Sequence, residues 1–165
     1  MTATCAICGA THEEDELELS YGRPDAIFDM PNDERSLDVY ESDDACVIDD
    51  ERFFLRATLP LPVQGRKDDY HIGVWVEISE EHFHRVGDLW DDPEQAAEPP
   101  MPATLANEIR HHEGSLGERV LMQLTGPNTR PQVFIVDPEL PLGHEQRAGI
   151  TTHRASTYSA GLAKA

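Results

Sequence analysis

The chain has 165 residues, of which 13 are Lys or Arg and 32 are Asp or Glu, so its formal net charge is −19. This charge disfavours nucleic acid and anionic membranes as partners, because binding through phosphate groups needs clustered basic side chains. The sequence contains neither a run of the roughly 18 apolar residues that a membrane span needs nor a signal-peptide pattern, so we expect a cytoplasmic protein whose partner is a protein or a small molecule.

The N-terminal segment holds the most specific motif, Cys5-Ala-Ile-Cys8-Gly9, followed by His12. Cys-x-x-Cys spacing lets two thiolates converge on one tetrahedral metal ion, and a structural zinc site needs four ligands. Because Cys46 is the third cysteine, we take Cys5, Cys8, His12 and Cys46 as candidate ligands and zinc as the expected cofactor. The alternative is that Cys5 and Cys8 form a weakly occupied pair and that Cys46 is a buried apolar residue of a strand.

Acidic residues concentrate in the segment from Glu13 to Glu51, which holds 16 of them and only two basic residues, Arg23 and Arg35. Such a run predicts a solvated acidic face. A surface that mimics nucleic acid and occupies a basic partner is the alternative.

Three strands are predicted next, since short runs rich in β-branched and aromatic residues alternate with polar links. They cover residues 45–48, 53–61 and 72–78. The links at 49–51 and 64–69 are too short for a parallel crossover, so they favour an antiparallel meander.

The second half of the chain combines helices with further strands. Ser79 is a predicted N-cap for a helix from Glu80 to Trp90, and the four prolines of residues 91–102 predict an exposed loop. The remaining predictions are a short helix over 104–111, strands over 120–125 and 132–136, and a helix over 140–150.

These elements predict an α+β fold built on a mainly antiparallel sheet of about five strands with two or three helices. We expect an N-terminal Cys-x-x-Cys knuckle over residues 1–12, a single α+β domain over 13–151 and a flexible tail over 152–165.

Candidate catalytic groups are few, because the common nucleotide-binding, zinc-protease and serine-hydrolase motifs are absent from the sequence. Glu145 lies in a segment expected to dock on the sheet, and Arg56 and Asp49 lie on or beside the first hairpin. Charge pairing explains such residues in most proteins. In the alternative they form one polar site in a cleft, with Glu145 as acid or base.

An ordered series of motifs gives the chain a family resemblance from about Cys5 to Thr151. The motifs are Cys5-x-x-Cys8-Gly9-x-x-His12, Asp44-Ala-Cys46-Val47-Ile48-Asp49, Phe53-Phe54-Leu55-Arg56, Leu61-Pro62-Val63, Gly73-Val74-Trp75-Val76-x-Ile78-Ser79, Arg130-Pro131 and Pro141-Leu142-x-x-Glu145-Gln146-x-x-Gly149-Ile150. With them the chain resembles the bacterial domain-of-unknown-function 2199 family. The resemblance implies a single bacterial domain and gives no residue a role.

Two departures from the family pattern bear on the site. Members usually carry Trp-Gly-Val-Trp where this chain has Ile72-Gly73-Val74-Trp75, and His-Pro-Leu where it has Leu140-Pro141-Leu142. If the family histidine is a ligand or a base, this chain lacks it unless His144 takes its place.

The sequence therefore predicts an uncharacterised bacterial protein that acts as a non-enzymatic binding or interaction domain, with a structural zinc site. The alternative function is a small-molecule hydrolase-like enzyme that uses Glu145, Arg56 and Asp49.

Overall fold

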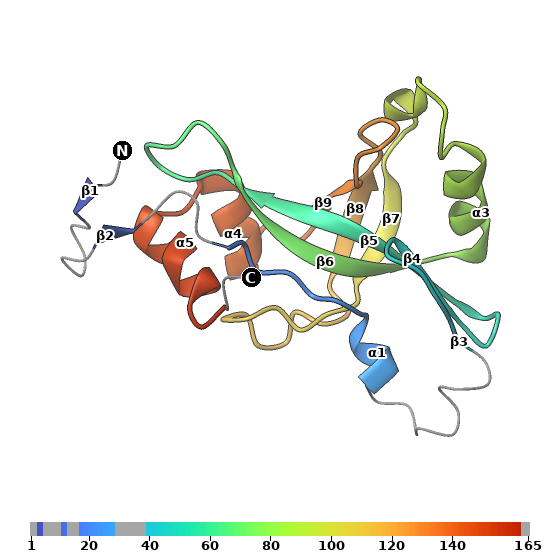
Figure 1. The fold of residues 1–165 in the computed structure, drawn as a ribbon, viewed down its shortest axis with the longest axis horizontal. Helices are drawn as coiled ribbons and strands as arrows, with labels where there is room; N and C mark the ends of the chain where they lie inside the picture. Colours follow the sequence, from blue (N-terminus) through green and yellow to red (C-terminus); the bar gives the residue numbers. More distant parts are fainter. Residues whose placement is uncertain (1–2, 5–10, 13–16, 29–38, 163–165) are drawn as a thin grey trace.

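The computed structural model describes residues 3–4, 11–12, 17–28 and 39–162. Its centre is a five-stranded barrel (Figure 1). The barrel strands, each antiparallel to the next, are β5 (Arg52–Leu61), β6 (Tyr70–Ile78), β7 (Met101–Leu105), β8 (Arg119–Gln123) and β9 (Gln132–Ile135). The barrel closes where β9 pairs with β5 in parallel, at Thr58 and Gln132.

Two further strands extend the sheet beyond the barrel. The strand β3 (Val39–Glu41) pairs with β4 (Ala45–Ile48), and β4 pairs with the first four residues of β5. One edge of β5 therefore serves β4 along its first part and β9 farther on. The predicted hairpin between β4 and β5 is confirmed, with positive φ at Asp49 and Asp50, as a tight primed turn requires.

The barrel interior is filled by alternate residues of the strands. From β5 and β6 the inward residues are Phe53, Leu55, Ala57, Leu59, Leu61, Tyr70, Ile72, Val74, Val76 and Ile78. All of these side chains are buried, and they belong to one continuous core. The period-two pattern that predicts the strands therefore also determines which of their faces lines the core.

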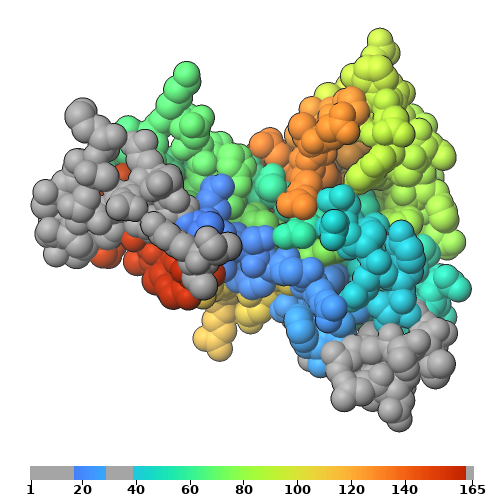
Figure 2. Space-filling model, in the orientation of Figure 1, coloured from blue at the N-terminus to red at the C-terminus, as the bar shows by residue number. Residues whose placement is uncertain are grey.

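A second, smaller core covers the outer face of β5 and β6. It consists of Ile27, Cys46, Ile48, Phe54, Trp75 and Ala106. The segment 17–28, which ends in α1 (Asp25–Phe28), runs across this side of the molecule (Figure 2). It reaches β6 closely only because residue 73 is glycine, since a Cβ there would lie 2.4 Å from Ser20 Oγ.

Helices flank the barrel at two places. The helix α3 (Glu80–Asp88) begins at the predicted N-cap Ser79, whose side chain accepts from the backbone N–H of His82. A 3₁₀ turn, η1 (Gln95–Ala97), follows. The helices α4 (Pro141–Ala148) and α5 (Thr152–Ser159) lie together near one end of the barrel (Figure 1). No helix in the described part of the chain is long and apolar enough to cross a membrane.

One side chain of α4 strengthens the barrel seam. Gln146 accepts a hydrogen bond from the N–H of Ile135 and donates to the carbonyls of Val133 and Pro60, at 2.8, 2.9 and 3.3 Å. It therefore bridges β5 and β9 at the point where their backbone pairing is short. A docked α4 is thus part of barrel closure.

The predicted fold class is wrong in two respects. The sheet is mixed and closes into a barrel with two additional strands, whereas we expected a mainly antiparallel sheet. The parallel contact joins residues 74 positions apart (132 minus 58), a separation for which sequence carries no local signal. The described N-terminal residues form a two-stranded sheet of β1 (Ala3–Thr4) and β2 (Thr11–His12) and show no metal knuckle.

Two local predictions also differ from the structure. Residues 104–111, expected as a helix, contain the end of β7 and a loop. The tail expected from residue 152 onward forms α5 over Thr152–Ser159, and its Tyr158 is completely buried. Most residues of α5 are small or polar, so its sequence lacks the apolar periodicity that would predict a buried helix.

Candidate functional site

The predicted zinc ligands fall in different parts of the molecule. Cys5 and Cys8 lie outside the described residues, and His12 lies on β2, which contacts α5. Cys46 lies on β4, at the other end of the barrel from α5 (Figure 1). Its side chain packs in the smaller core, and burial raises the pKa of its thiol to about 11, so the thiol is protonated. Among the described residues no group of three or more His, Cys, Asp or Glu could hold a metal.

Glu145 is the centre of a charged cluster between α4, α5 and the loop after β7, which we call the Glu145 cluster: His112, Glu145, Arg154 and Tyr158. Arg154 donates from Nη2 to Oε1 and from Nε to Oε2 of Glu145, at 2.9 and 3.2 Å. Tyr158 Oη donates to the same carboxylate at 3.0 Å, and His112 Nε2 lies 2.9 Å from Oε1. Arg154 also lies over the ring of Tyr158, 4.8 Å from its centroid.

The electrostatics of the cluster hold Glu145 in its ionised form. Burial by itself raises the pKa of a carboxyl group, but the hydrogen bonds from His112, Arg154 and Tyr158 outweigh burial and lower the pKa of Glu145 to about 2. Burial and the nearby carboxylate raise the pKa of Tyr158. Glu145 is thus a poor proton donor at neutral pH and acts as an acceptor that orders its neighbours.

A cavity of about 270 Å³ borders this cluster at His112. Its apolar wall includes Leu105, Ile135 and Leu140, and Ser115 and Glu118 are among its polar lining residues. Leu140 stands where the resemblance implies a histidine, and its side chain makes this wall apolar. His144 is exposed on α4 and is not among the lining residues, so it does not take that place.

Arg56 lies in a different environment, on the outer face of β5 opposite Trp75 of β6. It lines a second cavity of about 270 Å³, which we call the Arg56 pocket: Gly22, Arg23, Pro24, Glu41, Ser42, Asp43, Cys46, Arg56 and Trp75. Its Nη2 donates to Ser20 Oγ at 3.0 Å, and its Nη1 lies 3.5 Å from the carbonyl oxygen of Asp43.

The guanidinium of Arg56 has no ion-pair partner among the described residues, and only the longer-range attraction of the Asp44 and Asp43 carboxylates offsets its charge. Its Nε is buried without a hydrogen-bond partner, and no described carboxylate lies within ion-pair distance. Burial lowers the pKa of Arg56, and the positive charge of Arg130 lowers it further. The nearby carboxylate of Asp44 pairs with Arg130 at 3.2 Å.

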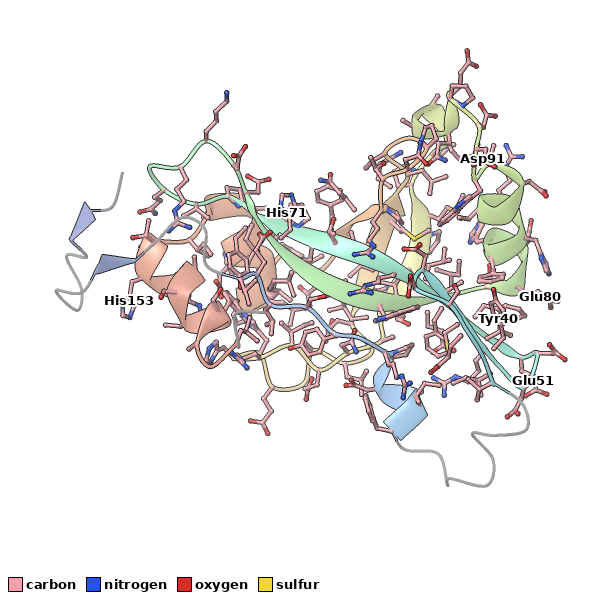
Figure 3. The ribbon with its side chains drawn as sticks, viewed as in Figure 1. Tyr40, Glu51, His71, Glu80, Asp91 and His153 are labelled. Carbon is pink, nitrogen blue, oxygen red and sulfur yellow. The ribbon has the colours of Figure 1, made fainter. Side chains whose placement is uncertain are left out.

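The structure does not bring Glu145, Arg56 and Asp49 into one pocket. Asp49 is exposed in the turn between β4 and β5. Glu51, in the same turn, lies at the opposite end of the molecule from His153 of α5 (Figure 3). Arg56 lies between these ends, on the barrel wall, and no cavity found among the described residues combines any two of the three.

Three members of the Glu145 cluster were not predicted as site residues. His112 directly follows the helix predicted over 104–111, and Arg154 and Tyr158 belong to the expected tail. Residues 111–112 lie in a loop in which His111 has positive φ, and so helical spacing does not apply to them. No local signal identifies these residues.

The comparisons with known proteins agree with the motif series. A family model described as "Uncharacterized protein conserved in bacteria (DUF2199)" matches residues 4–150. The chain belongs to the DUF2199 family. No curated protein and no solved structure matches it. The family match includes Arg56 and Glu145 and ends before α5, which supplies Arg154 and Tyr158.

Proposed function

We propose that this DUF2199 protein is a non-enzymatic binding domain and that the Arg56 pocket is its ligand site. The observation that carries the proposal is the guanidinium of Arg56, which lines a cavity with its Nε buried and unpartnered. A buried donor without an acceptor destabilises the folded state by about 1–3 kcal/mol, and more when it is charged. Such departures from full hydrogen bonding concentrate at functional or strained positions.

The Glu145 cluster supports an enzymatic role less well. Its acidic and basic groups bind one another, and the carboxylate of Glu145 already accepts from three side chains. A general acid or base needs a proton that it can exchange with a substrate near the working pH. Glu145, with a pKa of about 2, does not meet this requirement as an acid, and neither Arg56 nor Asp49 lies beside it.

The proposal is tested by the stability of two matched variants, Arg56→Met and Arg154→Met. Arg154→Met breaks the bidentate pair with Glu145 and is expected to lower the free energy of unfolding by about 2 kcal/mol, because the carboxylate keeps only its contacts with His112 and Tyr158. Arg56→Met removes a charge that has no described ion-pair partner and two neutral contacts, so its free energy of unfolding should stay within about 1 kcal/mol of the parent or rise. Urea unfolding at pH 7 measures both.

A loss of stability in Arg56→Met as large as that in Arg154→Met would contradict the proposal. It would mean that Arg56 serves the fold through Ser20 and Asp43, and the ligand site would lose its central group.

Zinc is the second part of the proposed function. The support is the Cys5-x-x-Cys8 spacing and the antiparallel pairing of Ala3 with His12, which returns the chain beside its start. We propose Cys5, Cys8 and His12 as three of the four ligands, whereas the protonated, buried thiol of Cys46 fits the smaller core.

Metal analysis of purified protein that has never met a chelator tests the zinc site. We expect about one zinc per chain in the parent and in Cys46→Ser, and loss of zinc in the Cys5→Ser, Cys8→Ser double variant, because structural zinc binds with roughly 10–16 kcal/mol. Less than about 0.2 zinc per parent chain contradicts the site, since such an affinity leaves few sites empty.

A further inference from the structure

We infer that the Arg56 pocket binds a ligand through a single carboxylate group. The inference rests on the proposed function and names the chemistry of the ligand. It follows from the donors, the size, the charge and the walls of the pocket.

The donors favour a planar oxyanion. A guanidinium has five N–H groups in a rigid fork that matches carboxylate and phosphate oxygens. The described acceptors of Arg56 are the hydroxyl of Ser20 and, at the limit of hydrogen-bond distance, the carbonyl of Asp43. Both are neutral, and the carboxylates of Asp44 and Asp43 act on the guanidinium only at longer range, so a ligand can form its first charge-assisted hydrogen bond.

The size of the pocket limits the ligand. Its volume of about 270 Å³ lies just below the range of about 300–1,000 Å³ that drug-sized ligands occupy. A small acid, or the carboxyl end of a larger molecule, fits this space.

The charges around Arg56 favour a monoanion over a dianion. Glu41 and Asp43 line the same pocket, and Glu41 is paired with Arg23 at 3.4 Å. The chain as a whole carries −19. A phosphate group has a charge of about −1.5 to −2 at neutral pH, so these acidic groups repel it more strongly than they repel a carboxylate.

The walls of the pocket offer little apolar surface. Trp75 and Cys46 line the pocket and belong to the smaller core. The indole N–H of Trp75 donates to the carbonyl of Tyr21 at 3.0 Å, so it does not need a ligand acceptor. Only 2% of Trp75 and 1% of Cys46 is exposed, so a ligand gains little from apolar contact and is recognised through its carboxylate.

The test is an NMR titration that follows the Nε–H signal of Arg56 and the indole N–H of Trp75. The probes are propionate, inorganic phosphate and propan-1-ol, at constant ionic strength set with sodium chloride. We expect saturable shifts with propionate, a dissociation constant at least tenfold higher for phosphate, and no saturable shift with propan-1-ol. Arg56→Lys keeps the charge and loses the fork, so it should weaken propionate binding at least tenfold.

Two further probes, a tripeptide with a free C-terminal carboxylate and its C-terminal amide, distinguish the source of the carboxylate. If the tripeptide with the free carboxylate binds more tightly than propionate and the tripeptide amide does not bind, the inference is supported. The ligand is then the C-terminus of a peptide chain. If this tripeptide binds no more tightly than propionate, the inference is also supported, and the ligand is a small free acid.

Phosphate binding as tight as that of propionate overturns the inference and leaves the binding function of the pocket in place. Shifts that do not saturate with propionate also overturn it. The proposed function is tested independently by urea unfolding, where a large loss of stability in Arg56→Met would contradict it.

Discussion

Arg154 and Arg56 show two opposite solutions to placing a guanidinium against a protein core. Arg154 binds both oxygens of Glu145 and lies over the ring of Tyr158. Arg56 contacts a hydroxyl and a carbonyl, and its Nε has no partner in the described part of the chain. At the α4–α5 end of the molecule the charged side chains therefore pair with one another. On the outer face of β5, by contrast, a guanidinium is left without a carboxylate partner in the described part of the chain.

The architecture explains why the two regions differ. At the α4–α5 end, α5 and the loop that contains His112 bring three side chains to one carboxylate, that of Glu145. On the outer face of β5, Arg56 stands across from Trp75, which provides no acceptor, and the nearest acidic groups pair with other arginines or line the rim. Predictions that separate these regions concern stability at one end and binding at the other.

The largest expected effect is at the barrel seam. Gln146→Leu keeps the volume of the side chain and leaves the N–H of Ile135 and the carbonyls of Val133 and Pro60 without their partner. Because each buried unsatisfied group costs about 1–3 kcal/mol, we expect the free energy of unfolding to fall by at least about 3 kcal/mol in urea denaturation.

His144→Leu is the matched control for this variant, since His144 is exposed on the same helix. Its free energy of unfolding should change by less than about 0.5 kcal/mol. Similar, small losses in the two variants would show that α4 is not part of barrel closure and would remove the contrast between the two regions.

A smaller effect is expected from acid. The pKa of Glu145 falls from an ordinary value of 4.5 in the unfolded chain to about 2 in the folded one. The stabilisation is therefore fully present above about pH 5 and is lost as the pH falls toward 2, with about 2 kcal/mol lost between pH 6 and pH 3. Urea unfolding at pH 6, 4 and 3 measures it.

The control for the acid effect is Glu145→Gln, which cannot titrate at this position. The parent should lose about 2 kcal/mol more than this variant between pH 6 and pH 3. If the free energy of unfolding changes with pH equally in the parent and in Glu145→Gln, the folded state does not stabilise the carboxylate. The charge of Glu145 would then be as poorly paired as that of Arg56.

The sequence predicted most of the local elements but not the closure of the sheet into a barrel. The strands from residue 45 to 78, the Ser79 cap and the helix from residue 141 follow from short-range patterns, and the structure confirms them. The parallel pairing of Thr58 with Gln132 and the contact of Arg154 with Glu145 depend on how segments meet in space. Neither contact leaves a periodicity in the sequence.

The amino-acid sequence by itself determined the acidic charge, the family, the hairpins and the inward face of each barrel strand, because these depend on composition, ordered motifs and the alternation of neighbouring residues. Only the tertiary structure decided which charged groups are matched and which are not. In the sequence Glu145 lies in a polar run and Arg56 in an apolar one, but long-range packing surrounds Glu145 with donors and leaves Arg56 facing a cavity. Pairing of buried charges depends on contacts between distant segments, so it becomes visible only when the barrel has closed.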